Sequence, residues 1–234
     1  MIGERLGQVR LRVARAALDA GRDPASVRVL LATKTQPVAL VREALEADAS
    51  ARAQDPALGA VLVGENRVQE LVAKGPGLAG RAEVHLIGPL QSNKVNAALR
   101  WASCIESVES LDLAERLSAR CTQALDVYVQ VNVSGEETKH GVGPHETVAL
   151  AEAVAALPHL RVAGLMTVGA RSDDPAEVRA GYALLRDLRD EILEAGAQTA
   201  TELSMGMSGD LELAIAEGAT LVRVGSAVFG ARPT

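Results

Sequence analysis

Apolar residues cluster into short runs along the chain, and stretches with a helical pattern separate these runs. The runs cover residues 27–33, 60–65, 83–88, 103–108, 126–133, 161–168, 201–205 and 221–229. Several of them are almost continuously apolar rather than alternating, which is typical of parallel strands covered on both faces. The pattern therefore predicts eight buried parallel strands.

The segments between the later runs show apolar residues at the i, i+3 and i+4 spacing of an amphipathic helix. The clearest are 111–121, 145–157 and 177–195. Pro175 stands where a first-turn proline is favoured, and Gly196 where a helix commonly ends. Strands that alternate with helices in this way predict an α/β fold with a parallel sheet.

Eight strands in a chain of 234 residues favour a single closed (β/α)8 TIM-type barrel over an open sheet, and we expect residues 1–234 to form one domain. The eighth run ends close to the last residue, so no helix is expected after it. An amphipathic segment at about residues 2–20 is predicted to be an extra N-terminal helix that covers this strand. Residues 47–59 are predicted to be a loop within the barrel.

Composition narrows the class of protein. Hydrophobic residues make up 48% of the chain but aromatic residues only 2%, so the core must consist mainly of alanine, leucine and valine. The net charge of −6 argues against a nucleic-acid partner, which would require a basic surface. Cys104 and Cys121 lack the spacing of metal ligands, and we expect both to be reduced thiols.

The chain shows no sequence signal for a membrane or for export. No stretch approaches about 18 uninterrupted apolar residues, and charged residues such as Glu4 and Arg5 interrupt the first segment. We therefore expect a cytoplasmic protein with no membrane partner.

Lys34 is the first residue that suggests chemistry. Only four of the 24 Lys and Arg residues are lysines, and Lys34 closely follows the apolar residues of the first run. The C-terminal ends of barrel strands carry the functional site. A nonpolar barrel mouth would favour the neutral amine, the form that attacks an aldehyde to give a Schiff base. The alternative is a strand-end lysine that extends into solvent.

Two strand ends are rich in glycine and serine, at 204–210 (SMGMSGD) and 224–227 (VGSA). Small residues let backbone N–H groups converge on an anion, and barrels commonly bind phosphate with the loops after strands seven and eight. In a closed barrel the eighth strand lies beside the first strand, and the seventh lies beside the eighth. The arrangement suits a small phosphorylated aldehyde that spans the gap to Lys34, although each segment could also be a simple tight turn.

Arg223 precedes Gly225 by two residues, so both can lie on one face of the eighth strand. A guanidinium group stays charged and only donates hydrogen bonds. If Arg223 faces a pyridine nitrogen, it keeps that nitrogen unprotonated and weakens the ring as an electron sink. The alternative is an ion pair with Glu202 or Glu217.

Other polar residues near strand ends are weaker candidates. Asn66 and Asn93 could orient a ring or line the barrel mouth, and they could equally cap the helices that follow. His85 lies within the third run and is expected to pack in the core, whereas His140 is expected to be solvated.

Several segments together resemble one protein family. They are 30–37 (LLATKTQP), 63–70 (VGENRVQE), 85–94 (HLIGPLQSNK), 129–142 (VQVNVSGEETKHGV), 164–168 (GLMTV) and 203–232, which contains SMGMS and RVGSA. The combination is similar to the pyridoxal phosphate homeostasis proteins, single-domain relatives of the barrel domain of alanine racemase. The resemblance extends from about Leu6 to Arg232.

The resemblance implies a barrel that holds pyridoxal 5′-phosphate (PLP) as a Schiff base on Lys34, with Arg223 at the pyridine nitrogen. The other cofactor contacts that we predict are Asn66, Ser204, Met205, Gly206, Gly225 and Ser226. The resemblance also implies a role in vitamin B6 homeostasis without established turnover. We therefore expect a monomer that binds PLP, no metal, and PLP-requiring apo-enzymes as partners.

The main alternative is a PLP-dependent enzyme similar to an amino-acid racemase. A two-base racemase needs an acid–base group opposite the lysine, which alanine racemases take from a tyrosine of a second domain. The tyrosines here, Tyr128 and Tyr182, fall within a predicted strand and a predicted helix. This favours binding and transfer of PLP over racemisation. A third hypothesis, a phosphate-binding barrel enzyme without PLP, predicts a colourless protein.

Overall fold

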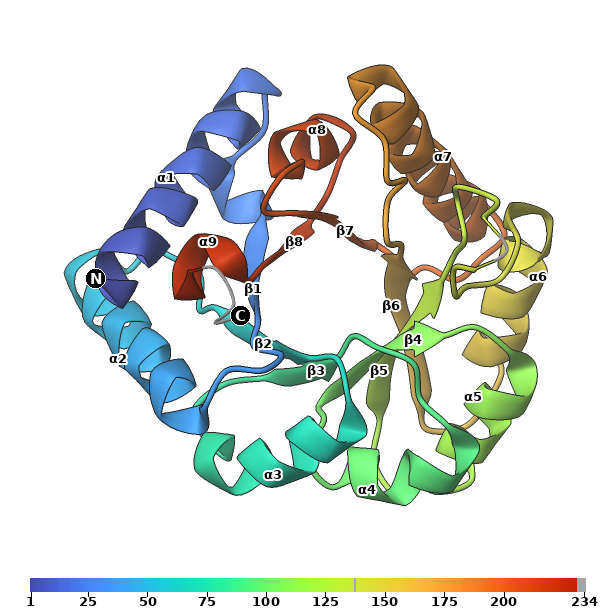
Figure 1. The fold of residues 1–234 in the computed structure, drawn as a ribbon. Helices are drawn as coiled ribbons and strands as arrows, with labels where there is room; N and C mark the ends of the chain where they lie inside the picture. Colours follow the sequence, from blue (N-terminus) through green and yellow to red (C-terminus); the bar gives the residue numbers. More distant parts are fainter. Residues whose placement is uncertain (137, 231–234) are drawn as a thin grey trace.

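The structure is a computed structural model that describes residues 1–136 and 138–230. Parts of two segments that carry the family resemblance, Glu137 and residues 231–232, lie outside this description. The strands are β1 (Arg28–Ala32), β2 (Leu62–Glu65), β3 (Val84–Leu86), β4 (Cys104–Val108), β5 (Leu125–Gln130), β6 (Leu160–Met166), β7 (Glu202–Met207) and β8 (Leu221–Val224). They form a closed parallel barrel in sequence order, in which β8 pairs with β1 (Figure 1), and this confirms the predicted TIM-type fold.

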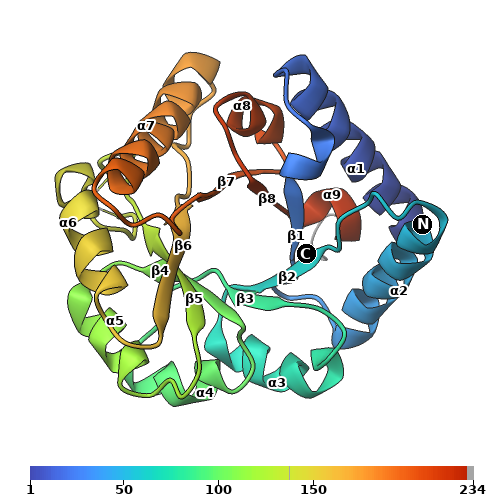
Figure 2. The same ribbon diagram turned by 180° about the vertical axis from the view of Figure 1, so that it is seen from behind.

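Helices surround the barrel in both views (Figures 1 and 2). They are α1 (Ile2–Asp19), α2 (Val38–Gln54), α3 (Val68–Leu78), α4 (Val95–Leu99), α5 (Leu111–Ser118), α6 (Pro144–Ala155), α7 (Pro175–Glu194), α8 (Leu211–Ala216) and α9 (Ser226–Phe229), with short 3-10 turns at Pro24–Ser26 and Ser92–Lys94. The predicted helices at 111–121, 145–157 and 177–195 correspond to α5, α6 and α7. In the part of the chain that the structure describes, no helix has both the length and the apolar character to cross a bilayer.

Helix α1 is the predicted extra N-terminal helix. Its buried residues, among them Leu6, Val9 and Val13, recur every three or four positions and so form one apolar face. This face packs in the same apolar layer as Val222 and Val224 of β8. Helix α1 contacts α8, α2 and α9 and completes the ring of helices outside β8 and β1 (Figure 1).

The eighth apolar run is not a strand throughout. Strand β8 ends at Val224, and Ser226–Phe229 form the short helix α9, so the prediction of a strand to residue 229 with no helix after it is wrong. The backbone turns at Gly225, which has φ −126° and ψ −77°. An apolar run of this length cannot by itself distinguish a strand from a strand followed by one helical turn.

The predicted loop at 47–59 is also mostly wrong, because α2 continues to Gln54. Alanine is the strongest helix former, and this segment is rich in alanine. Asp48 of this helix is buried and pairs with Arg10 of α1 and Arg52. The ion pair anchors the extended helix, so that only the residues after Gln54 form the connection to β2.

Alternate residues of each strand face either the helices or the barrel interior. On β1, Val29 and Leu31 belong to the large apolar layer shared with the helices, whereas Leu30 packs with Leu62 and Leu221 in a separate cluster. Polar side chains are buried on both faces of the strands. Thr33 and Glu65 continue the helix-facing positions of Leu31 and Val63. The buried polar residues inside the barrel include His85, Glu106, Ser204 and Arg223. Polar groups can be buried at low cost only when they bond to one another. These hydrogen bonds determine the geometry of the site.

Candidate functional site

A cavity of about 460 Å³ opens at the C-terminal ends of β1, β2, β7 and β8. Its lining consists of Ala32, Lys34, Thr35, Gln36, Gly64, Asn66, Ile87, Val168, Met207, Ser208, Gly209, Arg223, Gly225, Ser226 and Gly230. Of the predicted cofactor contacts, Lys34, Asn66, Arg223, Gly225 and Ser226 meet here. The volume falls within the range of small-molecule sites, roughly 300–1,000 Å³.

Lys34 lies at the rim of this cavity, two residues after β1 ends. The chain turns there, because the Gln36 N–H donates to the Thr33 carbonyl oxygen at 3.0 Å and Thr35 adopts a positive φ of 65°. Lys34 is an exposed residue in this structure, so the predicted nonpolar surroundings of its amine are wrong. The turn carries the side chain away from the buried strand, while Thr33 before it stays buried.

A buried ion-pair network lies beneath the Lys34 turn, and the sequence pattern did not reveal it. The Lys74 ammonium on α3 donates to the Thr33 carbonyl oxygen at 2.7 Å. The same group donates to Glu65 Oε1 at 2.9 Å and to Glu70 Oε2 at 3.0 Å. Glu70 Oε2 also accepts the Thr35 N–H at 2.7 Å. Both neighbours of Lys34 are thus bonded to this network, which holds the turn in place.

The carboxyl groups of this network differ in environment. Burial raises the pKa of Glu65, although hydrogen bonds from Lys74 and Thr33 oppose the shift. Burial acts in the same direction on Glu70 but is outweighed by the Thr35 N–H and Lys74, so that the pKa of Glu70 is lowered. Lys74 therefore opposes the rise in the pKa of Glu65 and contributes to the lowered pKa of Glu70.

Arg223 extends from β8 into the barrel and reaches the floor of the cavity, where it is 5% exposed. Its Nη1 donates to the carbonyl oxygen and to Oγ of Ser204, both at 2.7 Å, and its Nη2 donates to the Thr167 carbonyl oxygen at 2.6 Å. Three of the five guanidinium N–H groups thus have acceptors within the described residues. The remaining two are available to an acceptor in the cavity.

The alternative in which Arg223 pairs with Glu202 or Glu217 is wrong. Glu202 accepts a hydrogen bond from Thr220 at 2.6 Å instead. Glu217 pairs with arginines of α7, including Arg179. Neither carboxylate competes for the face of Arg223 that meets the cavity.

Three predicted contacts from β7 do not line the cavity. Ser204 lies inside the barrel, where it bonds to Arg223, whereas the Met205 side chain belongs to the apolar layer on the helix side. Gly206 is buried with φ +88°, and a Cβ there would meet Ala214 at 2.5 Å. Strand β7 runs to Met207, two residues further than the apolar run at 201–205 indicated. The residues of this segment that line the cavity therefore come from the end of β7 and the loop after it.

The residues from this segment that line the cavity are Met207, Ser208 and Gly209. Within the described residues, the Ser208 and Gly209 N–H groups and the Ser208 hydroxyl make no hydrogen bond to the protein. Met207 donates its N–H to Asp210 Oδ1 at 2.6 Å, which shapes the loop. The motif SMGMS was the correct signal, but the polar groups that face the cavity lie at its C-terminal end.

The remaining sequence candidates have clear positions. Asn66 lines the cavity, and α3 begins after Arg67 as its cap, so Asn66 does not cap that helix. Asn93 is exposed in the 3-10 turn at Ser92–Lys94, away from the cavity lining. His85 packs in the core as predicted, and its Nδ1 lies 2.6 Å from Glu106 Oε1. His140 is exposed, also as predicted.

Gly88 supports the position of Asn66, and we predict that replacing this glycine by alanine destabilises the protein. A Cβ at Gly88 would lie 2.1 Å from the Asn66 carbonyl oxygen, so Gly88→Ala must displace that backbone. Overpacking of this kind costs typically about 1–3 kcal/mol of folding free energy. Urea denaturation measures the loss. Gly59→Ala is the matched control, because no atom lies within 4 Å of the new Cβ. Equal stability of the two variants would contradict the prediction.

Comparison with known proteins agrees with this geometry. Residues 12–233 match the family model described as alanine racemase, N-terminal domain. The pyridoxal phosphate homeostasis protein of Pseudomonas aeruginosa is 44% identical over 235 residues, which cover 99% of this chain and 96% of that protein. A structure of an unknown protein from Bifidobacterium adolescentis is 41% identical with a TM-score of 0.90, and the match covers 97% of this chain and 94% of that chain.

A further solved structure adds a ligand to the comparison. It is PipY of Synechococcus elongatus PCC7942 with PLP bound, which is 34% identical with a TM-score of 0.81. The match covers 98% of this chain and 100% of that chain. Full-length matches at this identity define the family. This chain therefore belongs to the pyridoxal phosphate homeostasis protein family, and its barrel is an alanine racemase N-terminal domain.

Proposed function

We propose that this chain binds PLP as a Schiff base on Lys34 and acts in cellular PLP homeostasis, without catalytic turnover. The observation that carries the proposal is that Lys34 and Arg223 line one cavity of suitable size. Homologues named for PLP homeostasis and a relative solved with PLP bound support it.

The chemistry of the cavity fits PLP. A primary amine at the rim can bond to the aldehyde carbon. Arg223 offers unused N–H groups to the pyridine nitrogen, which can only accept. The hydroxyls and N–H groups of Ser208 and Ser226 are donors suited to a phosphate. A Cβ at Gly225 would lie 3.1 Å from the Ala32 carbonyl oxygen, so glycine allows the end of β8 to approach β1 closely at this wall.

The charge on Arg223 argues against strong carbanion chemistry. Bound PLP supplies an electron sink, and this sink is strongest when the ring nitrogen is protonated. A guanidinium donates a hydrogen bond to that nitrogen but does not give up its proton at neutral pH. Arg223 therefore orients the ring and leaves it a weak sink, which suits storage better than turnover.

The positions of the tyrosines also support a carrier over a racemase. Tyr128 is buried in β5 and Tyr182 in α7, as the sequence indicated, and neither lines the cavity. The Tyr182 hydroxyl donates to Asp210 Oδ2 at 2.9 Å. Burial raises the pKa of both phenols, Tyr128 and Tyr182, so neither is prepared to accept a proton as a base.

The proposal extends to matters of cellular context. The partners are PLP-requiring apo-enzymes, the protein is a cytoplasmic monomer, and residues 1–234 act as one PLP-binding domain. Cys104 and Cys121 are free thiols in the structure, which accords with a reducing compartment.

Visible absorption of the purified protein after addition of PLP, together with equilibrium dialysis, tests the binding role. We expect saturable binding and an absorbance band that free PLP lacks. A protein that remains colourless and binds inorganic phosphate as well as PLP would support the phosphate-binding enzyme instead. Incubation of the loaded protein with single-enantiomer amino acids tests turnover, and sustained inversion over many turnovers would reject the carrier role.

A further inference from the structure

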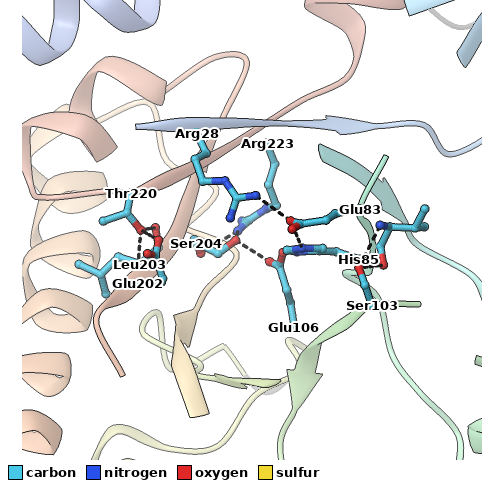
Figure 3. Close-up of polar contacts among 11 residues, drawn as sticks. Arg28, Glu83, His85, Ser103, Glu106, Glu202, Leu203, Ser204, Thr220 and Arg223 are labelled. Carbon is cyan, nitrogen blue, oxygen red and sulfur yellow. Dashed lines mark hydrogen bonds and ion pairs between the residues drawn. The ribbon is translucent and has the colours of Figure 1, made fainter. Parts of the chain in front are cut away.

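A chain of buried polar side chains crosses the barrel interior from the cavity toward its opposite end (Figure 3). It begins at Arg223 below the cavity and continues through Ser204 and Glu106 to His85. Beyond His85 lies Glu83, which pairs with Arg28. The members from Arg223 to His85 come from β8, β7, β4 and β3, so the chain ties together opposite sides of the barrel. The sequence patterns gave no sign of Glu106, which sits within an apolar run.

Glu106 sets the direction of these hydrogen bonds. It is 0% exposed, and an ionised carboxylate can only accept. Ser204 Oγ lies 2.5 Å from Glu106 Oε2 and must therefore donate its single proton to Glu106. The lone pairs of that hydroxyl are then left to accept from Arg223 Nη1 at 2.7 Å. Glu106 thus orients Ser204, and Ser204 orients the guanidinium.

Electrostatics favour the same arrangement. Burial alone would raise the pKa of Glu106, but the hydrogen bond from His85 and the charges of His85 and Arg223 outweigh it and lower the pKa. Burial lowers the pKa of Arg223, and the charge of Glu106 opposes this shift. A buried guanidinium without a counter-ion would be costly. The interior carboxylate that faces Arg223 through a single hydroxyl is that of Glu106.

We propose that Glu106 is a positioning residue for the cofactor, and that it acts as the interior counter-ion that holds Arg223 in contact with the pyridine nitrogen. The proposal rests on the proposed PLP function. Glu106 does not touch the cavity, so it influences PLP only through Ser204 and Arg223. When Glu106 loses its charge, Arg223 is no longer held against the cavity floor and the contact with the ring nitrogen weakens.

Glu106→Gln tests the proposal in the full-length PLP-loaded protein. We expect PLP affinity to fall by about 10-fold to 100-fold, since hydrogen bonds to charged groups contribute that much. The decisive readout is the ¹⁵N chemical shift of the ring nitrogen in labelled PLP. It should move from the wild-type value toward the value in Arg223→Ala. Glu202→Gln is the matched control, because this carboxylate bonds to Thr220 outside the chain (Figure 3), and it should keep the wild-type shift and affinity.

Ser204→Ala tests the same proposal independently. It removes the hydroxyl that connects Glu106 to Arg223 but keeps the charges of both residues. It should move the ¹⁵N shift in the same direction, and it decides the question if thermal unfolding shows that Glu106→Gln does not fold. A wild-type ¹⁵N shift in a folded Glu106→Gln or Ser204→Ala protein would overturn the role of Glu106. Failure of the wild-type protein itself to bind PLP would instead overturn the proposed function.

Discussion

Replacement of Lys34 by alanine is expected to abolish covalent capture of PLP while the barrel remains folded. The reason is that Lys34 is the lysine on the lining of the cavity that also holds Arg223. The residue is exposed and lies in a turn, so its removal should change the unfolding free energy by less than about 0.5 kcal/mol. Borohydride reduction of the loaded protein followed by peptide mass spectrometry measures the covalent adduct.

Two control variants sharpen this test. Lys34→Arg keeps the positive charge but cannot form a Schiff base with the aldehyde, so it should also show no adduct. Lys94→Ala removes a lysine that lies outside this cavity and should leave the adduct unchanged. An adduct on Lys74, Lys94 or Lys139 in the wild-type protein would refute the assignment to Lys34.

Replacement of Lys74 by methionine is expected to lower the free energy of unfolding more than Gly88→Ala or Lys34→Ala does. The side chains of Lys74 and Glu65 are 8% and 0% exposed, and Lys74 also satisfies the Thr33 carbonyl. Removal of one partner of a buried ion pair costs about 3–5 kcal/mol. Glu70 would also lose a bond that helps it hold the Thr35 N–H, so the Lys34 turn should loosen. Urea denaturation and PLP affinity measure the two effects.

The pH dependence of this variant follows from the raised pKa of Glu65. Without Lys74 the shift grows, because burial then acts with less opposition. The folded state holds the Glu65 proton at pH values where the unfolded state has already lost it. Stability should therefore fall as pH rises from the unfolded pKa of about 4.3 to the raised folded value, and the deficit of Lys74→Met should be larger at the upper end of this range.

A second substitution, at Glu65, should restore part of the stability that Lys74→Met removes. Glu65→Gln in the Lys74→Met background removes the unpaired charge, and it should recover a large part of the lost stability. Lys94→Met serves as the control for the change of side-chain type. No recovery in the double variant would show that the loss comes from packing rather than from the unpaired carboxylate.

The sequence was informative where a local pattern determines structure. The apolar runs located all eight strands, and the lysine after the first strand and the arginine in the eighth were correctly placed on one cavity. The residues at which strands end were harder to predict, because the hydrophobic pattern and the residue composition change little at the end of a buried strand. Ser204 and Met205, which the family resemblance implied as cofactor contacts, lie within β7 and do not line the cavity, whereas Ser208 and Gly209 do.

Contacts between distant residues could not be predicted in the same way. Glu106 and Ser204 are separated by 98 residues and meet only because the barrel closes. Lys74 lies on the inner side of α3, and its role depends on the distance between α3 and the Lys34 turn. Such charged residues look like ordinary helix or strand positions until the fold brings their partners together.

The pairing of β1 with β8 has a consequence for biosynthesis. Strand β1 can pair with β8 only after about 190 further residues have been synthesised. The apolar face of α1 likewise stays uncovered until its contacts α8 and α9 have been synthesised. A ribosome adds about 5–20 residues per second, so these early segments stay incomplete for at least about ten seconds. During that interval the nascent chain exposes an open sheet edge and an uncovered helix, which are the surfaces that chaperones bind and that aggregation uses.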